Sequence, residues 1–235
     1  MNSNQILVKN NFSNINLKDE IINSDTIISD LDGTIADPAK YIAIYDNLKN
    51  GKLLDINFIY WVFNSSIKFL RFGRQTELDS WREYMHLFLN NKKELDKIVK
   101  KFKKEKINLY LYPKVSEFYS LLQHKYKILM TRNISQIGKA FGNYLDVDEI
   151  ITEAFDKESE TLRFIYRNRH LKKYIIFDDY EDDLEAVVNV LKFCKRKNIV
   201  DTVSSFFVSD NFDKVNCNFD VILGRDYSGL VKMLV

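Results

Sequence analysis

Two carboxylates flank an apolar residue in the stretch Asp30-Leu31-Asp32-Gly33-Thr34. Residues two apart in extended backbone point to the same side, and Gly33 permits a sharp turn directly after them. Carboxylates crowded in this way repel one another, and a hard cation with oxygen ligands, such as Mg²⁺, relieves that repulsion. The stretch therefore predicts a cation-assisted site, with a solvated acidic loop that caps a helix as the alternative.

A hydroxyl and an acidic cluster follow two other apolar runs. Thr131 comes directly after Ile128–Met130, and the acidic residues of segment 178–183 come directly after Tyr174–Phe177. In an open parallel sheet, ligands bind outside the carboxyl ends of the strands. We therefore expect three strand ends to bring several carboxylates and a hydroxyl to one edge of a sheet.

The elements that position these residues are apolar runs that end abruptly instead of alternating, which predicts strands buried on both faces. The runs are Thr26–Ser29, Ile128–Met130, Tyr174–Phe177, Ser205–Val208 and Asp220–Leu223. Segments with helical period lie between them. This order predicts an α/β fold: a Rossmann-like parallel sheet core with right-handed crossovers and helices on both faces.

Residues 38–111 interrupt this alternation with aromatic-rich helical patterns and no comparable strand. The stretch is too long for an ordinary crossover and long enough for a helical subdomain. Only two prolines occur in the 235 residues, and Pro38 and Pro113 stand at its two edges. We predict a catalytic core of residues 1–37 and 112–235 and a smaller α-helical cap domain of residues 38–111.

Composition narrows the class of protein. The chain is 46% hydrophobic and 29% charged with a net charge of +2, which is typical of a globular protein and excludes a disordered or collagen-like chain. Met1–Asn10 lacks the pattern of a signal peptide. The longest hydrophobic region, Phe58–Phe72, is interrupted by polar residues and is too short to predict a transmembrane helix. We expect a cytoplasmic protein without a membrane partner.

The Asp30–Thr34 stretch resembles the first signature of the haloacid dehalogenase superfamily. Members of that family are mostly Mg²⁺-dependent phosphatases that work through an aspartyl-phosphate intermediate. Thr131, a lysine and the acidic cluster follow in the order that is typical of the family. The resemblance therefore covers about residues 24–37 and 112–235. The insert resembles the family's cap domain in placement and character only.

The resemblance implies that Asp30 is the nucleophile and that Asp32 is the general acid and base. It implies that Thr131 binds phosphoryl oxygens, with Gly33 in the turn beside the phosphate. Arg132 stands where a small or amide residue is common in the family. Its guanidinium could reach a substrate anion or pair with the surplus of neighbouring acids.

The phosphate-stabilising lysine of the family matches Lys157, which precedes a helical segment and then the acidic strand end. The proline that usually follows this lysine is absent, and Lys139 remains the alternative.

The metal ligands implied by the resemblance are Asp30, Asp32, Asp179 and Asp183. Asp178 stands where the family often has glycine. The pair Asp178 and Asp182 has the same spacing as Asp179 and Asp183, so this second assignment stays open.

The sequence therefore predicts a Mg²⁺-dependent phosphatase that cleaves a small phosphorylated metabolite. A phosphomutase or phosphotransferase would use the same core residues. A non-catalytic protein that binds through the lysine-rich segment Lys92–Lys106 is a further alternative, although we do not expect nucleic acid as a partner. Asp32 disfavours dehalogenation, because departure of an alkoxide, unlike that of a halide, needs a proton donor.

Overall fold

The structure is a computed structural model that describes residues 6–8, 14–36, 107–133, 135–210 and 219–235. These residues belong to one compact unit of the chain, formed by Met1–Asp37 and Lys104–Val235. The expected cap domain lies almost wholly outside the described residues, as does the lysine-rich segment. The division into core and cap stays a prediction.

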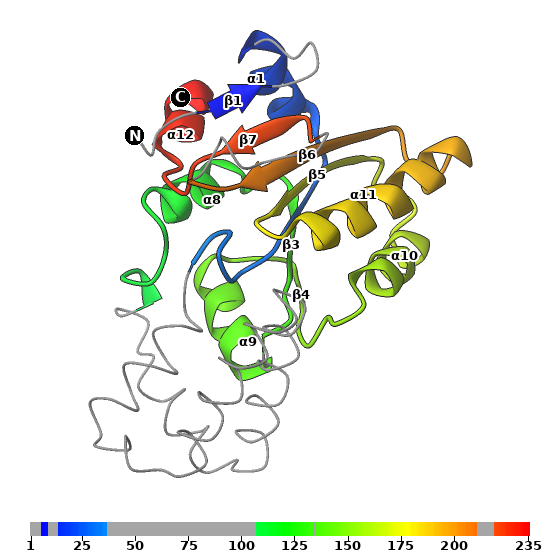
Figure 1. Ribbon diagram of the computed structural model, residues 1–235, viewed down its shortest axis with the longest axis horizontal. Helices are drawn as coiled ribbons and strands as arrows, with labels where there is room; N and C mark the ends of the chain where they lie inside the picture. Colours follow the sequence, from blue (N-terminus) through cyan, green and yellow to red (C-terminus); the bar gives the residue numbers. More distant parts are fainter. Residues whose placement is uncertain (1–5, 9–13, 37–106, 134, 211–218) are drawn as a thin grey trace, which may run out of the picture. The chain divides into compact units, whose positions relative to one another are not determined.

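Within the described residues, seven strands form one sheet in the order β1-β7-β6-β5-β2-β3-β4 (Figure 1). Each strand is parallel to its neighbours, except that β1 is antiparallel to β7. The strands are β1 Ile6–Val8, β2 Thr26–Ser29, β3 Tyr126–Met130, β4 Glu149–Ile151, β5 Lys173–Asp178, β6 Thr202–Val208 and β7 Val221–Leu223.

The strand order reverses at β2. The chain continues from β2 to β3 and β4 on one side, and then returns to the other side of β2 with β5, β6 and β7. Ser29 at the end of β2 lies in register with Leu129 of β3 and Phe177 of β5. The residues that follow β2 and β5 therefore leave the sheet side by side, at the point of strand reversal where open α/β sheets bind ligands.

Helices cover both faces of this sheet. On one face α10 packs against α11, and on the other α8 packs against α12. The acidic first turn and basic last turn of α11 suit the helix dipole. The helices are α1 Asn14–Asn23, α8 Val115–Leu121, α9 Ser135–Tyr144, α10 Lys157–Arg167, α11 Glu181–Arg196 and α12 Ser228–Leu234.

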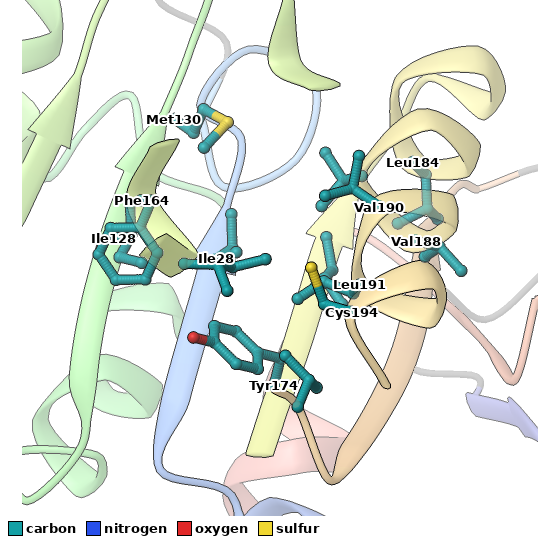
Figure 2. Packing of buried hydrophobic residues seen from close by; sticks show 14 of the residues in the cluster. Ile28, Ile128, Met130, Phe164, Tyr174, Leu184, Val188, Val190, Leu191 and Cys194 are labelled. Carbon is teal, nitrogen blue, oxygen red and sulfur yellow. The ribbon is translucent and has the colours of Figure 1, made fainter. Parts of the chain in front are cut away.

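The core follows from the two-residue period of the strands. Ile28, Ile128 and Ile176 of adjacent strands are buried under Phe164 of α10 and Leu191 of α11 (Figure 2). The residue after each isoleucine points the opposite way. Leu129 and Phe177 follow two of these isoleucines and are buried, so the sheet has apolar residues on both of its faces.

The opposite layer is aromatic and centres on Phe177. Its ring lies 5.7 Å from that of Phe118 on α8 and 4.6 Å from that of Phe206 on β6, between ring centroids. Phe118 in turn lies 5.4 Å from Tyr227, just before α12. This layer packs directly behind the strand end from which Asp178 emerges.

The expected fold class is confirmed: the described core is an α/β sheet with helices on both faces, and all five apolar runs form strands. The strands β1 and β4 were not expected from the sequence. In the part of the chain that the structure describes, no helix is both long and apolar enough to cross a membrane. The cytoplasmic location stays a prediction.

Candidate active site

The loop after β2 turns back on itself within a few residues. Backbone amides of Ile35 and Ala36 donate to the carbonyl of Leu31 at 3.2 and 3.0 Å, and that of Gly33 donates to Ala36 at 2.8 Å. Gly33 has φ of 83°, in the left-handed region that glycine adopts without strain. The loop therefore presents its first residue, Asp30, at the sheet edge.

Lys157 is the centre of a buried charge cluster. It is the first residue of α10, its side chain is 4% exposed, and Asp156 caps the helix by accepting from the Ser159 amide at 3.0 Å. Its Nζ lies 2.9 Å from Asp30 Oδ1. The same nitrogen lies 2.7 Å from Asp178 Oδ2 and 3.1 Å from Asp183 Oδ2.

The alternative lysine lies elsewhere. Lys139 is an exposed residue of α9, whereas Lys157 contacts the proposed nucleophile directly. This placement favours Lys157 over Lys139 as the active-site lysine. Its role in the reaction stays a proposal.

Burial and mutual repulsion raise the pKa values of two carboxyl groups in this cluster. Burial raises the pKa of Asp30 to about 7, with Asp32 and Asp179 acting in the same direction and Lys157 opposing them. Burial likewise raises the pKa of Asp178 to about 7 against the effect of Lys157. Burial opposes the charge of Lys157 itself, but the surrounding carboxylates outweigh it and hold the lysine pKa above its usual range. The cluster has more negative than positive charge, which favours a further cation.

Three carboxylates are close enough to share that cation. Asp30, Asp178 and Asp179 each offer an oxygen, and these oxygens lie within 4.8 Å of one another. A compact set of carboxylate oxygens suits Mg²⁺, which prefers hard oxygen ligands and completes its shell with water or substrate oxygens. The donor set of this chain therefore fits the ion that the resemblance implies.

This set differs from both assignments made from the sequence. Asp183 pairs with Lys157, and Asp182 is exposed and accepts from the Tyr180 hydroxyl at 3.1 Å. Asp178, the last residue of β5, and Asp179 directly after it both stand beside Asp30. The Lys157 ammonium pairs with Asp30 and Asp178 as well, and Asp183 differs from these two in that it also pairs with Arg132.

Asp32 belongs to a separate hydrogen-bond network. The side-chain amide of Asn133 donates to both of its carboxylate oxygens, at 2.9 and 3.2 Å. The hydroxyl of the fully buried Thr131 donates to Asp32 Oδ2 at 3.4 Å and accepts from the Asn133 backbone amide at 3.1 Å. The strand end of β3 thus fixes the direction of the Asp32 carboxylate.

Arg132 turns away from Thr131 toward the acidic cluster. It donates through Nη2 to Asp183, and its guanidinium carbon lies 5.4 Å from the centre of the Tyr180 ring. Of the two possibilities open from the sequence, pairing with a neighbouring acid is the arrangement present here.

Asn133 and Arg225 contact the site without having been assigned a role from the sequence. Asn133 binds Asp32, and Arg225 donates from Nε to the carbonyl of Gly33 at 3.1 Å. Asn133 lies three positions after the end of β3, and Arg225 lies two positions after the end of β7. The acidic residues were selected because they follow the carboxyl ends of strands. The same criterion would have selected Asn133 and Arg225 as well.

Replacing Gly33 by alanine is expected to destabilise the fold by roughly 1–3 kcal/mol. A Cβ at this position would lie 2.0 Å from Asp179 Oδ2, and the positive φ is unfavourable for alanine. Urea denaturation of the variant and the parent protein measures the difference. Unchanged stability would show that the loop does not keep this backbone in solution.

No family model matches the sequence, and no curated protein matches it. The solved structures that resemble its fold include the following two. The crystal structure of cytosolic 5'-nucleotidase IIIB bound to cytidine has a TM-score of 0.57 and 13% identity, over 97% of this chain and 93% of that chain. The structure of the catalytic CPx-ATPase domain CopB-B has a TM-score of 0.52 and 13% identity, over 97% and 94%.

At such low identity these likenesses concern the fold alone. The parallel sheet with its reversal at β2 and the charge cluster at its carboxyl edge agree with the resemblance of the Asp30–Thr34 stretch. The chain shares an α/β fold with these two structures.

Proposed function

We propose that this chain is a Mg²⁺-dependent phosphatase that hydrolyses a small phosphomonoester through an aspartyl-phosphate on Asp30. The observation that carries the proposal is the buried Lys157 ammonium, 2.9 Å from Asp30 and flanked by Asp178 and Asp183 at the carboxyl edge of the sheet. A carboxylate held in this way beside a fixed cation can attack a phosphoryl group.

In the first step a carboxylate oxygen of Asp30 bonds to phosphorus as the bond between phosphorus and the leaving oxygen breaks. Asp32 gives its proton to that oxygen, so that an alcohol departs. In the second step a water attacks the phosphorus of the aspartyl-phosphate and gives its proton to Asp32, while the bond between phosphorus and the Asp30 oxygen breaks. Inorganic phosphate leaves, Asp30 is again a carboxylate and Asp32 is again protonated.

The other residues hold these groups in place. Lys157 orients Asp30 and balances negative charge that grows on the phosphoryl oxygens. Asn133 holds Asp32 toward the leaving oxygen. The 3.4 Å contact from Thr131 to Asp32 is long for a hydroxyl donor, so a phosphoryl oxygen can replace it as acceptor. Bound by Asp30, Asp178 and Asp179, Mg²⁺ would neutralise charge on the phosphoryl group.

A phosphomonoester panel assayed with and without Mg²⁺ tests the proposal. Nucleoside 5'-monophosphates belong in the panel because one protein of similar fold is a 5'-nucleotidase. Sugar phosphates, phosphoamino acids and a generic aryl phosphate complete it. We expect release of inorganic phosphate that stops when the metal is chelated. A pure product of isomerisation would instead indicate a mutase, and no turnover of any ester would contradict the proposal.

Magnesium is also expected to stabilise the substrate-free protein. A ligand that binds only the folded state contributes about 2.7 kcal/mol at one hundred times its dissociation constant. Thermal denaturation with MgCl₂, compared with NaCl at equal ionic strength, measures the shift. Asp178→Asn should reduce the shift, while the matched variant Asp182→Asn should retain it, because Asp182 is exposed. Equal shifts in the two variants would contradict the ligand set.

A further inference from the structure

The turn at Gly33 is held in place by hydrogen bonds that three of its consecutive carbonyl groups accept. Gly33 accepts from Arg225 Nε at 3.1 Å, and Thr34 accepts from the Tyr227 hydroxyl at 3.1 Å. The carbonyl of Ile35 accepts from the Tyr112 backbone amide at 2.9 Å. The donors come from residues far along the chain, so the position of the turn depends on tertiary structure and not on local sequence.

Arg225 also reaches the acidic cluster. Its Nη2 lies 3.8 Å from Asp179 Oδ2, which makes an ion pair without a close hydrogen bond. The arginine is itself fixed in place: its backbone amide donates to Asp210 at 3.1 Å, and its guanidinium lies 5.4 Å from the centre of the Tyr112 ring. One always charged side chain therefore contacts both the turn and a carboxylate.

The turn and this carboxylate are in direct steric contact. The space in which a Cβ of Gly33 would stand is 2.0 Å from Asp179 Oδ2, so the carboxylate lies against the bare glycine backbone. A shift of the turn would therefore move Asp179, and a shift of Asp179 would move the turn. Arg225 donates a hydrogen bond to the turn and forms an ion pair with Asp179.

We propose that Arg225 is a positioning residue that joins the Gly33 turn to the Asp179 carboxylate and thereby sets the affinity of the site for Mg²⁺. The inference rests on the proposed function, because it takes Asp179 as a ligand of that ion. Arg225 acts through Asp179 and contacts neither the metal nor the phosphoryl group. Residues that orient metal ligands typically contribute 10- to 100-fold to metal affinity.

The test measures Mg²⁺ binding in the absence of substrate, by calorimetric titration of MgCl₂ into the intact protein. Arg225→Gln should raise the dissociation constant about tenfold or more. Arg225→Lys should raise it less, because an ammonium can still donate to the Gly33 carbonyl and pair with Asp179, and so hold both in place. The matched control Arg163→Gln should bind as the parent does, since Arg163 is an exposed residue that pairs with Glu160 on α10. Parent-like affinity in both Arg225 variants would overturn the inference.

Steady-state kinetics separate positioning from direct contact with substrate. If Arg225 acts through Asp179, saturating Mg²⁺ restores most of the kcat of Arg225→Gln and KM for the ester stays near that of the parent. A raised KM at saturating Mg²⁺ with unchanged metal affinity would instead make Arg225 a substrate-binding group and overturn the inference. Should the glutamine variant fail to fold, Arg225→Lys carries both measurements.

Failure of this inference can be told from failure of the proposed function. If the parent protein binds Mg²⁺ and hydrolyses esters, and the Arg225 variants behave as the parent does, only the positioning role of Arg225 is contradicted. If the parent protein binds no Mg²⁺ and hydrolyses no ester, the proposed function is contradicted, and this inference fails with it.

Discussion

Asp30→Asn is expected to lower phosphatase activity by at least about 10³-fold while leaving the protein folded. The amide cannot form the acyl-phosphate, because its oxygen is a far weaker nucleophile than a carboxylate. Loss of the Asp30 charge should leave the protein folded, because Lys157 keeps Asp178 and Asp183 as partners. Burial raises the pKa of Asp30 to about 7, which means that the folded protein disfavours its ionised form.

The measurement is release of phosphate from the best ester of the panel, together with the melting temperature. The matched control is Asp182→Asn, which removes one carboxylate from an exposed position of the acidic cluster and should keep parent-like activity. Acid-quenched parent protein should contain one phosphoryl group on the peptide that includes Asp30. Full activity in the Asp30 variant would exclude the aspartyl-phosphate mechanism.

The strands of the sheet interior could be predicted from the sequence, whereas those at its edges could not. Interior strands are buried on both faces and appear as unbroken apolar runs. β1 and β4 have three residues each and lie at the two edges of the sheet. Leu7 in β1 is 43% exposed, and all three residues of β4 are half-buried. A short edge strand has no continuous apolar pattern that would distinguish it from a loop.

The site could be predicted as far as the strand ends but not in its pairing of charges. Position after a buried strand identified Asp30, Thr131 and the acidic cluster, because parallel strands end at one edge. Which acid faces a metal depends on where the cations arrive from other parts of the chain. Lys157 pairs with both Asp178 and Asp183, but Arg132 pairs with Asp183 alone of these two, and Asp178 stands beside Asp30.

The hydrogen-bond partners of the Gly33 turn could not be predicted from the sequence either. Gly33 could be identified from the sequence as the residue that permits the turn. Its carbonyl partner Arg225 lies 192 residues away, and the partner of Thr34, Tyr227, lies 193 residues away. Contacts of this range follow from the packing of α12 beside α8 and leave no local pattern in the sequence.

Lys157→Met is expected to lower both activity and stability. Methionine fills similar space but leaves the carboxylates of Asp30, Asp178 and Asp183 without their common ammonium. Removing one partner of a buried ion pair typically costs about 3–5 kcal/mol. Loss of a cation that stabilises the transition state typically costs about 10²- to 10³-fold in rate. Urea denaturation in the presence of a chelator measures the first effect, and ester hydrolysis at saturating Mg²⁺ measures the second.

Lys139→Met is the matched control, because Lys139 is an exposed lysine of α9 and was the alternative from the sequence. A surface change of this kind should alter the free energy of unfolding by less than about 0.5 kcal/mol and leave turnover intact. If Lys139→Met abolished turnover and Lys157→Met did not, the assignment of the lysine would be reversed.

Magnesium binding to the Lys157 variant distinguishes an electrostatic role from mere collapse of the site. With the ammonium gone, a divalent cation meets more uncompensated negative charge at Asp30 and Asp178. Mg²⁺ should therefore raise the melting temperature of Lys157→Met by more than it raises that of the parent protein, even though the variant turns over slowly. A smaller shift than in the parent would mean that Lys157 mainly holds the carboxylates in position. Its charge would then contribute little to the affinity of the cluster for cations.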